Sequence, residues 1–467
     1  MLTDDARYAA LTARDPRFDG VFFVGVRTTG IYCRPICPAR TPRRSRCEFF
    51  ASPVLAERAG FRACFRCRPE LAPGNAPVDS VDALVAAATQ RIAEGALNDA
   101  SIDELATQLG VSGRHLRRAL ETKLGVSPVE LAHSRRLALA KQLLQDTALP
   151  VTDIAFAAGF GSVRRFNALF AARMGGAPSQ LRRRHGDSPG GLALRLDYRP
   201  PYDWQHVLAF LRARAIPGVE HVDTTYRRIV HLGGLTGEIE IAHDRDTLRL
   251  TVTPPLLPVL MPLVARVRRM FDLDARPDLI AAVLRRDRRL APLVRARPGL
   301  RVPGAIDPFE ASVRALLGQQ VSVAAATTLA GRFAAQLGTP FGEQFRFPTP
   351  GDVVAAGPAR IARIGLPQAR ATAIHTFARE VASGALRLDA PCDLDAFVAQ
   401  LVELPGIGPW TAQYLAMRAL HVPDAFPAAD LGVQKALRRV GAKSAEARAE
   451  AWRPYRAYAV MHLWSSL

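Results

Sequence analysis

The 467-residue sequence is poor in acidic side chains relative to basic ones. Its 43 Asp and Glu residues stand against 62 Lys and Arg residues, which gives a formal net charge of +19 and an isoelectric point near 10.6. Such an excess is unusual for an enzyme of neutral substrates. It favours a polyanionic partner, because counterion release then contributes to binding. A GC-rich genome also enriches arginine, so composition alone leaves that explanation open.

Long apolar runs are missing as well. The N-terminal segment MLTDDARYAALTARD has neither the basic nor the apolar region of a signal peptide, and no uninterrupted apolar run could span a bilayer. With 49% hydrophobic residues and a mean hydropathy near zero, the composition is typical of well-packed globular domains. The length predicts about three or four such domains. We therefore expect a cytoplasmic protein without a membrane partner.

Cysteine is scarce beyond residue 70. Five of the six cysteines precede it, in the order Cys-x3-Cys, Cys47 and Cys-x2-Cys, while Cys392 stands alone in PCDLD. This distribution does not fit a secreted disulfide framework and indicates a reducing compartment. Two close pairs a short distance apart in the chain suit one tetrahedral Zn²⁺, with Cys47 as a spare thiol. The predicted zinc ligands are Cys33, Cys37, Cys64 and Cys67.

Arginines crowd around this cluster, and Arg34, Arg66 and Arg68 are among them. We expect their charges to draw DNA phosphates toward the metal. On spacing alone, however, a zinc site that only stabilises the fold is favoured over a reactive one.

The runs VGVRTTGIYCRPICPAR and GFRACFRC closely resemble the N-terminal domain of Ada-type methylphosphotriester methyltransferases, the regulators of the bacterial adaptive response to alkylation. The resemblance covers residues 5–72. It implies that the four cysteines bind zinc and that Cys33 irreversibly accepts a methyl group from a phosphotriester in DNA. A zinc-bound thiolate stays deprotonated at neutral pH and is therefore nucleophilic. Methylation would remove one of the two net negative charges of the zinc centre, which strengthens DNA binding and turns repair into a signal. Ala63 departs from the family, which has Pro before the third cysteine.

A repeated pattern occupies residues 77–187, after a linker that begins at Pro73-Gly74. A capping box at Ser101–Glu104 predicts a helix that ends near Gly110, and the amphipathic run SGRHLRRALETKLG predicts a second helix. Another capping box, Ser127–Glu130, opens a long linking helix, after which DIAFAAG and SVRRFNALFAARMG repeat the pair. A short helix, a glycine turn and a basic second helix are typical of a helix-turn-helix, although a single copy would also fit a plain helical hairpin.

The region resembles the AraC-type double helix-turn-helix domain, both in its duplication and in the motifs VSGRHLRRAL…LGVSP and DIAFAAGF. This resemblance implies promoter binding by two second helices in successive major grooves, with RNA polymerase as a further partner. The candidate base-reading residues are Arg114, His115, Arg118, Arg164 and Asn167.

Residues 188–275 follow a linker at Asp187–Gly191 and mix strand patterns with helix patterns. LALRLDYRPPYD, YRRIVHL, EIEIAHD and TLRLTVTP predict strands, while VLAFLRARAIPG and LLPVLMPLVARVRRMFDLD predict helices. No cluster of catalytic residue types stands out, so we expect a supporting module. PPYDW and MFDLDARP resemble the N-terminal, TBP-like α/β domain of 3-methyladenine DNA glycosylase II.

Residues 276–467 are almost entirely helical in pattern. Asp307-Pro308 predicts a helix start, with Glu310 in the capping-box position. The stretch LPGIGPWTAQYLAMRAL opens with a turn in which Gly406 and Gly408 leave the backbone bare, so that its N–H groups and the next helix could bind a DNA phosphate. Such turns also simply connect helices. Together with FPAADLGVQKAL, this stretch resembles the AlkA-type, alkylation-repair branch of the helix-hairpin-helix DNA glycosylases.

The glycosylase resemblance assigns roles to five side chains. Asp430 matches the catalytic aspartate, whose carboxylate stabilises positive charge on the sugar, although an Asp before a helix is more often only an N-cap. Trp410 stands where bifunctional relatives carry a nucleophilic Lys, which predicts base removal without strand cleavage. Trp410, Tyr414 and Trp464 match positions that line the base pocket, where aromatic faces favour a cationic alkylated purine by about 0.5–2 kcal/mol. Gln320, in GQQVSV, occupies the position whose side chain fills the gap left by the base.

The sequence therefore predicts a multidomain, mainly α protein with α+β parts. It comprises a small zinc α/β domain (1–76), an all-α double helix-turn-helix (77–187), an α/β module (188–275) and an all-α helix-hairpin-helix glycosylase (276–467). The predicted functions are stoichiometric methyl transfer from DNA methylphosphotriesters, damage-responsive transcription activation, and excision of 3-methyladenine- and 7-methylguanine-type bases. A damage-sensing transcription factor whose glycosylase half binds DNA without catalysis is the alternative. We expect a monomer that acts on double-stranded DNA in the bacterial nucleoid.

Overall fold

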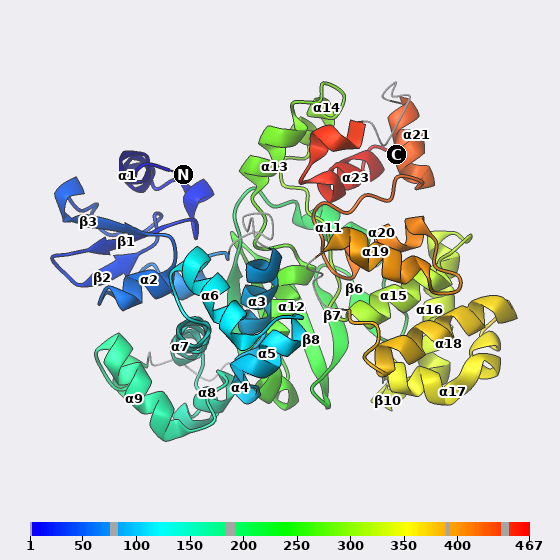
Figure 1. Ribbon diagram of the computed structural model, residues 1–467, viewed down its shortest axis with the longest axis horizontal. Helices are drawn as coiled ribbons and strands as arrows, with labels where there is room; N and C mark the ends of the chain where they lie inside the picture. Colours follow the sequence, from blue (N-terminus) through cyan, green and yellow to red (C-terminus); the bar gives the residue numbers. More distant parts are fainter. Residues whose placement is uncertain (1, 75–82, 183–191, 389–392, 440–447) are drawn as a thin grey trace. The chain divides into compact units, whose positions relative to one another are not determined.

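The computed structural model describes residues 2–74, 83–182, 192–388, 393–439 and 448–467 (Figure 1). The chain forms two compact units. The first comprises Met1–Pro200, Asp244–Ala265 and Leu273–Ala275, and the second comprises Pro201–His243, Arg266–Asp272 and Arg276–Leu467. The linker after Gly74, the linker at Asp187–Gly191 and Cys392 lie outside the described residues. Among the described residues, no helix is long and apolar enough to cross a membrane.

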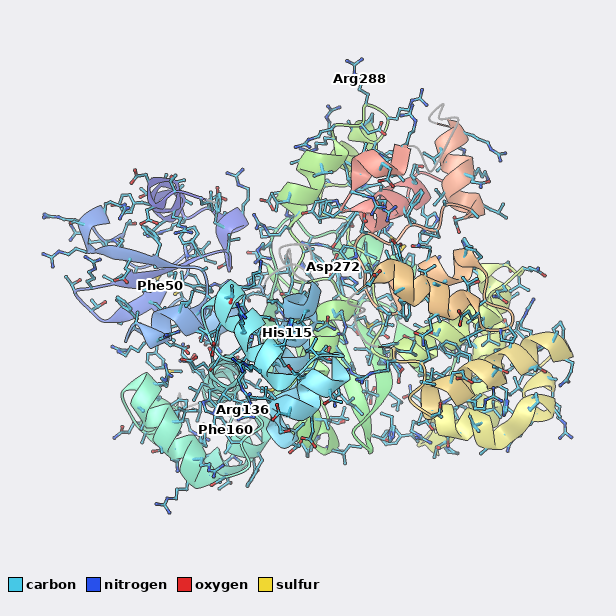
Figure 2. The ribbon with its side chains drawn as sticks, in the orientation of Figure 1. Phe50, His115, Arg136, Phe160, Asp272 and Arg288 are labelled. Atoms are coloured by element: carbon cyan, nitrogen blue, oxygen red, sulfur yellow. The ribbon has the colours of Figure 1, made fainter. Side chains whose placement is uncertain are left out.

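A four-stranded sheet organises the N-terminal part of the first unit. Its strand order is β3-β1-β2-β4, with β1 antiparallel to both of its neighbours and β2 parallel to β4. Gly25 of β1 lies between the rings of Phe50 (Figure 2) and Phe61, whose atoms would come within 2.8 Å of a Cβ at this position, so a larger residue could not pack here. The elements are α1 (Asp4–Ala13), β1 (Phe23–Val26), β2 (Ile31–Cys33), β3 (Cys47–Phe50), α2 (Pro53–Arg58) and β4 (Arg62–Ala63).

Short helices around one long buried helix fill residues 83–182. They are α3 (Ala83–Ala93), α4 (Ala96–Asp99), α5 (Ile102–Gln108), α6 (Gly113–Leu124), α7 (Pro128–Asp146), α8 (Val151–Ala157), α9 (Val163–Met174) and α10 (Pro178–Leu181). Both predicted capping boxes form, at Ser101–Glu104 and Ser127–Glu130. The second helix of each pair, α6 or α9, ends at a left-handed glycine, Gly125 or Gly175. The predicted duplication is therefore confirmed.

The α/β segment contributes strands to both units. In the first unit, β5 (Leu192–Asp197) pairs antiparallel with β9 (Thr247–Val252). In the second unit, β7 (Tyr226–Leu232) pairs antiparallel with β6 (Glu220–Val222) and with β8 (Leu235–Asp244). The four predicted strands are all present, whereas β6 was not predicted because three residues are too few to show alternation. The helical elements are α11 (Trp204–Arg212), the 3₁₀ helix η5 (Pro254–Val259) and α12 (Leu260–Met270).

The rest of the second unit is helical, as predicted, apart from one small hairpin of β10 (Thr339–Phe341) and β11 (Gln344–Arg346). The helices are α13 (Pro277–Leu284), α14 (Ala291–Ala296), α15 (Pro308–Leu317), α16 (Val323–Leu337), α17 (Pro350–Ala362), α18 (Gln368–Ala382), α19 (Leu394–Val402), α20 (Pro409–Arg418), α21 (Leu431–Arg439), the 3₁₀ helix η6 (Glu450–Trp452) and α23 (Arg456–Trp464).

The start of α15 is confirmed, but the capping-box role of Glu310 is wrong. Asp307 caps the helix by accepting hydrogen bonds from the N–H groups of Phe309 and Glu310. The Glu310 carboxylate instead accepts two bonds from Arg228 of β7, at 3.0 and 2.5 Å. Burial raises the pKa of Glu310 to about 7 against the lowering effect of Arg228. A buried carboxylate is costly without a cationic partner, and the Glu310 side chain therefore points toward Arg228 and not back toward the helix N-terminus.

Candidate functional sites

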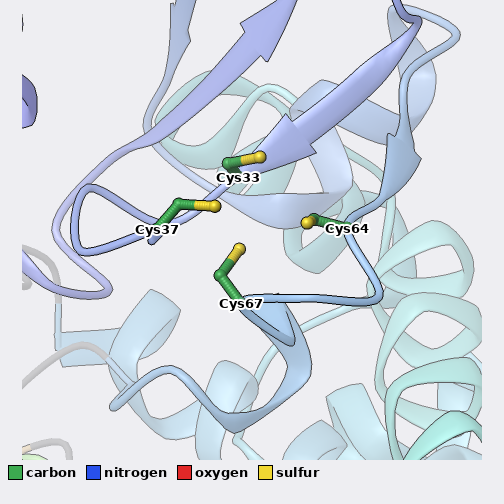
Figure 3. A group of neighbouring side chains, drawn as sticks. All are labelled: Cys33, Cys37, Cys64 and Cys67. Atoms are coloured by element: carbon green, nitrogen blue, oxygen red, sulfur yellow. The ribbon is translucent and has the colours of Figure 1, made fainter. Parts of the chain in front are cut away.

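Four cysteines meet at one end of the N-terminal sheet. Cys33 is the last residue of β2, Cys37 follows it, and Cys64 and Cys67 follow β4. Figure 3 shows their side chains pointing toward a common centre, and their Sγ atoms lie within 4.8 Å of one another. Zn–S bonds of about 2.3 Å place tetrahedral sulfur atoms roughly 3.8 Å apart, so the group fits one Zn²⁺. The predicted four-cysteine zinc site is confirmed, and Cys47 lies outside it.

The thiols of this cluster influence one another directly. The Arg34 backbone N–H donates to the Sγ of Cys67 at 3.4 Å. Hydrogen bonding with Cys33 lowers the pKa of the Cys64 thiol, whereas hydrogen bonding with Cys37 raises the pKa of the Cys33 thiol. Four sulfur atoms this close cannot all ionise without a cation among them, and a bound Zn²⁺ supplies that positive charge.

Arg34 does not have the role expected from the sequence. Its side chain is buried, and it donates to Asp19 and to Asp197 of β5, each at 2.8 Å. Burial lowers the pKa of Arg34, but the two carboxylates raise it by more. Arg34 is thus an internal counter-charge, and the expectation that it draws DNA phosphates is wrong. Arg68 is paired internally as well, whereas Arg66 is exposed.

The loop that contains Cys64 is held against helix α7 by buried charged side chains. Lys141 of α7 is 1% exposed and donates to the Cys64 carbonyl at 2.9 Å and to Glu70 at 2.6 Å. Arg68 donates to Asp146, the last residue of α7, at 2.5 and 2.9 Å. Since α7 joins the two helix-turn-helix pairs, the cysteine cluster and the double helix-turn-helix share one buried charge network.

All five candidate base-reading residues lie on exposed faces of the two second helices (Figure 2 labels His115). They are Arg114, His115 and Arg118 on α6, and Arg164 and Asn167 on α9. The opposite face of each helix is packed into the core, with Leu116 of α6 and Phe166 of α9 fully buried. This amphipathic arrangement leaves the polar faces free to meet a DNA groove.

In the second unit, Asp430 lies directly before α21, and three N–H groups hold its carboxylate. Trp464 Nε1 donates to Oδ1 at 2.8 Å, and Trp410 Nε1 donates to Oδ2 at 3.1 Å. The backbone N–H of Val433 also donates to Oδ1, at 2.9 Å. This last bond is the ordinary N-cap bond, so Asp430 is an N-cap. Capping does not account for the two indoles, which come from α20 and α23.

Aromatic rings surround this carboxylate. Trp410 stacks on Tyr414 with ring centroids 5.4 Å apart, and Tyr414 lies 6.4 Å from Trp464 in a tilted arrangement. The structure therefore brings together three of the four residues that were predicted to bind the base. Phe210 of α11 stacks on Trp464 at 6.4 Å and is an addition to the predicted set. It lies in a distant part of the sequence, and only its place just after PPYDW could have pointed to it.

Positive charge lies around Tyr414, which the sequence did not reveal. Burial raises the pKa of Tyr414, but the guanidinium groups of Arg418, Arg214 and Arg314 lower it by more, so that the pKa is lowered overall. Arg418 and Arg214 lie over the ring of Phe210, with Cζ 4.5 and 3.7 Å from its centroid. Burial lowers the pKa of Arg418 to about 10. The phenol of Tyr414 is therefore surrounded by cations as well as by rings.

The glycine turn before α20 has the expected form. Gly406 has a left-handed φ of +78°, and a Cβ there would lie 2.9 Å from that of Ala373, whereas Gly408 is exposed with open space around it. The side chain of Gln319 donates to the Gly406 carbonyl at 2.8 Å. Gln320 is exposed with a φ of +58°. Within the part of the chain that the structure describes, no hydrogen bond joins Gln320 to the aromatic group.

A buried carboxylate supports the helices that carry the two indoles. Asp272 (Figure 2) accepts a hydrogen bond from the Tyr458 hydroxyl at 3.1 Å and pairs with His421 Nε2 at 3.0 Å. Tyr458 belongs to α23, which carries Trp464, and His421 follows α20, which carries Trp410. Through these two contacts Asp272 links α23 to the C-terminal end of α20.

Four family models match the chain. They are the metal binding domain of Ada at residues 6–70, a helix-turn-helix domain at 105–184, the AlkA N-terminal domain at 193–307, and the HhH-GPD superfamily of base excision DNA repair proteins at 313–456. Together these matches follow the order of features found above.

Relatives of known name match either the whole chain or parts of it. The probable bifunctional transcriptional activator/DNA repair enzyme AlkA of Mycobacterium tuberculosis is 39% identical over 98% of this chain and 96% of its own length. DNA-3-methyladenine glycosylase 2 of Escherichia coli is 39% identical over 58% of this chain and 95% of its length. The bifunctional activator/repair enzyme Ada of Escherichia coli is 42% identical over 27% of this chain and 34% of its length.

Solved structures also show similarity in fold to part of the chain. The 3-methyladenine DNA-glycosylase from Archaeoglobus fulgidus matches with a TM-score of 0.51 and 22% identity, over 58% of this chain and 97% of that one.

Proposed function

The chain belongs to the family of bifunctional transcriptional activator/DNA repair proteins that join Ada-type to AlkA-type domains, and we propose that it both repairs alkylated DNA and activates transcription in response to the damage. The observation that carries the proposal is the presence of two different anionic groups in one chain, the four-cysteine zinc site and the indole-held carboxylate of Asp430. We further propose the four-domain division at 1–76, 77–187, 188–275 and 276–467. The family matches at residues 6–70 and 105–184 fall inside the first two domains, whereas the AlkA N-terminal match, at 193–307, extends past residue 275.

At the cysteine cluster, the proposed reaction is irreversible methyl transfer from a DNA methylphosphotriester to Cys33. The Cys33 sulfur forms a bond to the methyl carbon as the C–O bond breaks, and the electron pair of that bond goes to the phosphate oxygen, which restores a phosphodiester. Zinc held by the cysteines supplies the charge that keeps a thiolate deprotonated at neutral pH. The methylated cluster has one negative charge fewer, so it repels the DNA backbone less.

The double helix-turn-helix is proposed to read a promoter through its exposed polar faces. Support comes from the exposure of the five candidate residues on α6 and α9, beside fully buried apolar faces. The net charge of +19 supplies affinity for the phosphate backbone of double-stranded DNA. We propose RNA polymerase as the further partner of the DNA-bound protein, and a monomer acting on DNA in the cytoplasm as its working form.

In the second unit, the proposed reaction is hydrolysis of the bond between an alkylated base and its sugar. The C1′–N bond breaks, its electron pair leaves with the base, and the oxygen of a water molecule bonds to C1′ while its proton passes to solvent. The Asp430 carboxylate stabilises the positive charge that develops on the sugar. Alkylation at N3 or N7 makes a purine cationic, and the rings of Trp410, Tyr414 and Trp464 suit such a base.

The enzyme is proposed to leave an abasic site without cutting the strand. A lyase needs an amine that forms a Schiff base with the sugar, and Trp410 stands at the position of that amine in bifunctional relatives. The indole N–H of Trp410 is bonded to Asp430 and is not a nucleophile. Excision by this chain is therefore monofunctional.

An excision assay with Asp430→Asn tests the proposal. Duplex DNA carrying methylated purines is incubated with excess protein, and the released base is measured over time. The Asn side chain keeps the shape but lacks the charge, so release falls by about 100-fold or more while DNA binding persists. Equal release by the wild type and the variant would remove Asp430 from the mechanism. If neither protein releases base, the second unit only binds DNA and the chain is a regulator.

A further inference from the structure

We propose that Trp410 and Trp464 are positioning residues for base excision, because their indole N–H groups fix the orientation of the Asp430 carboxylate. This inference rests on the excision reaction proposed above. It adds a second role to residues that the sequence suggests only as faces for the flipped base.

The hydrogen bonds define the carboxylate plane. Trp464 binds Oδ1 at 2.8 Å and Trp410 binds Oδ2 at 3.1 Å, while the Val433 N–H binds Oδ1 at 2.9 Å. Two donors on different oxygens prevent rotation about the last side-chain bond, which a single N-cap bond would permit. A carboxylate offers about four acceptor positions, so one position on Oδ2 stays free for the reacting sugar or water.

The indoles are themselves immobilised by neighbours from other helices. Trp410 stacks on Tyr414 at 5.4 Å, and Trp464 stacks on Phe210 at 6.4 Å. Gly432 leaves the space that this arrangement needs, since a Cβ there would lie 3.0 Å from Asp430 Oδ1 and 3.1 Å from the Trp464 ring. The carboxylate is thus supported from α11, α20 and α23 at once.

This support suits an anion that must stabilise charge without moving. A group that is already oriented when the sugar becomes positive needs no reorganisation during the reaction, which is the main source of electrostatic catalysis. Each indole also binds the carboxylate with its edge, so its face is not used by the hydrogen bond. A base that stacks on such a face therefore meets a ring whose position also sets the position of Asp430.

The second unit contains a comparable indole–carboxylate pair that no described contact joins to Asp430. Trp452 Nε1 donates to Asp287 Oδ2 at 3.0 Å, and Trp452 is 1% exposed. It packs against Phe426 and belongs to the short helix η6. Trp452→Phe loses the same kind of bond and a more deeply buried ring than the two active-site variants, whose indoles are half-buried, so it sets an upper measure of the general destabilisation that the change causes.

The test compares Trp410→Phe, Trp464→Phe and Trp452→Phe in the full-length protein. Each Phe keeps an aromatic face and removes the N–H donor. Single-turnover excision of a methylated purine and affinity for the same duplex are measured separately, together with the midpoint of thermal unfolding. We expect each active-site variant to excise roughly tenfold more slowly, or slower still, with unchanged DNA affinity. Trp452→Phe should excise at the wild-type rate, although its unfolding midpoint falls by at least as much.

The possible contrary results are distinct. Wild-type excision by either active-site variant contradicts the proposal, as does a loss that appears only in DNA affinity. An equal slowing in Trp452→Phe would assign the effect to general destabilisation and would also contradict it. Asp430→Asn is run in parallel. If that variant excises normally, the proposed excision mechanism fails, whereas an inactive Asp430→Asn beside fully active Phe variants defeats only the positioning role.

Discussion

The cysteine cluster and the Asp430 site hold negative charge in opposite ways. Around the cysteines, full charges balance one another: Arg34 lies between Asp19 and Asp197, and Lys141 is bonded to Glu70. Around Asp430, the direct partners are neutral N–H groups from two indoles and the backbone. A cluster of thiols needs a cation to ionise together, whereas a single carboxylate needs only donors that orient it.

This difference matches the chemistry proposed for each site. A sulfur that accepts a methyl group once would be altered permanently, and in the proposed mechanism its loss of charge is the signal for the regulator. A carboxylate that acts repeatedly must return unchanged to the same orientation after every base is released.

Zinc removal is the strongest way to separate the two sites. Structural zinc contributes on the order of 10 kcal/mol to the folding of small domains, so a chelator should unfold the N-terminal sheet and abolish methyl acceptance. Base excision should continue, because the one group of described residues that could hold a metal ion is the cysteine cluster of the first unit. Circular dichroism and the excision assay check both outcomes, with added Zn²⁺ as the control. Parallel loss of excision would show that the sites depend on one another.

Lys141→Met tests the charged character of the first site. Lys141 is fully buried, and its removal leaves Glu70 with Arg68 as the remaining cation. Breaking a buried ion pair from one side costs about 3–5 kcal/mol, and the remaining Arg68 places the expected loss in the free energy of unfolding near 3 kcal/mol. Lys123→Met, an exposed change on α6, should cost almost nothing. Chemical denaturation of both variants measures the difference, and equal stability would contradict the account.

Acidification should weaken the second unit through His462, which is on α23 with Trp464. Burial lowers the pKa of His462 from 6.5 to about 4. The unfolded chain therefore binds a proton that the folded chain does not, and stability falls as the pH drops from 6.5 toward 4. Between pH 7 and pH 5 the expected loss in the free energy of unfolding is about 2 kcal/mol. Denaturation at several pH values measures it, and His462→Gln should remove this part of the dependence. An unchanged pH profile in the variant would argue against it.

Local features of the fold could be predicted from the sequence, and features that depend on distant partners could not. The capping boxes at Ser101 and Ser127 formed as expected, because all the atoms involved lie within a few residues. Glu310 has the same local pattern, yet a buried guanidinium from β7 determined its direction. The four zinc ligands were predictable for a related reason, since paired cysteines carry their own geometric constraint.

The same limit applies to the candidate site at Asp430. The family resemblance pointed to the aspartate and to three aromatic residues, and the structure brings these four together. The resemblance could not indicate that the indole N–H groups bind the Asp430 carboxylate, in addition to the role of the ring faces in lining the base pocket. For Phe210, which reaches the site from a separate segment of the chain, its place just after PPYDW was the only signal in the sequence. Hydrogen bonds between segments far apart in sequence leave no periodic or spacing signal.

The most direct test exposes one methylated duplex to the wild type, Cys33→Ser and Asp430→Asn, with protein mass and released base measured in the same reaction. The wild type should gain the mass of one methyl group and release base. Cys33→Ser should release base without gaining mass, and Asp430→Asn should gain mass without releasing base. If one substitution abolishes both readouts, or the wild-type mass never changes, the claim that this chain contains two separate reactive sites is contradicted.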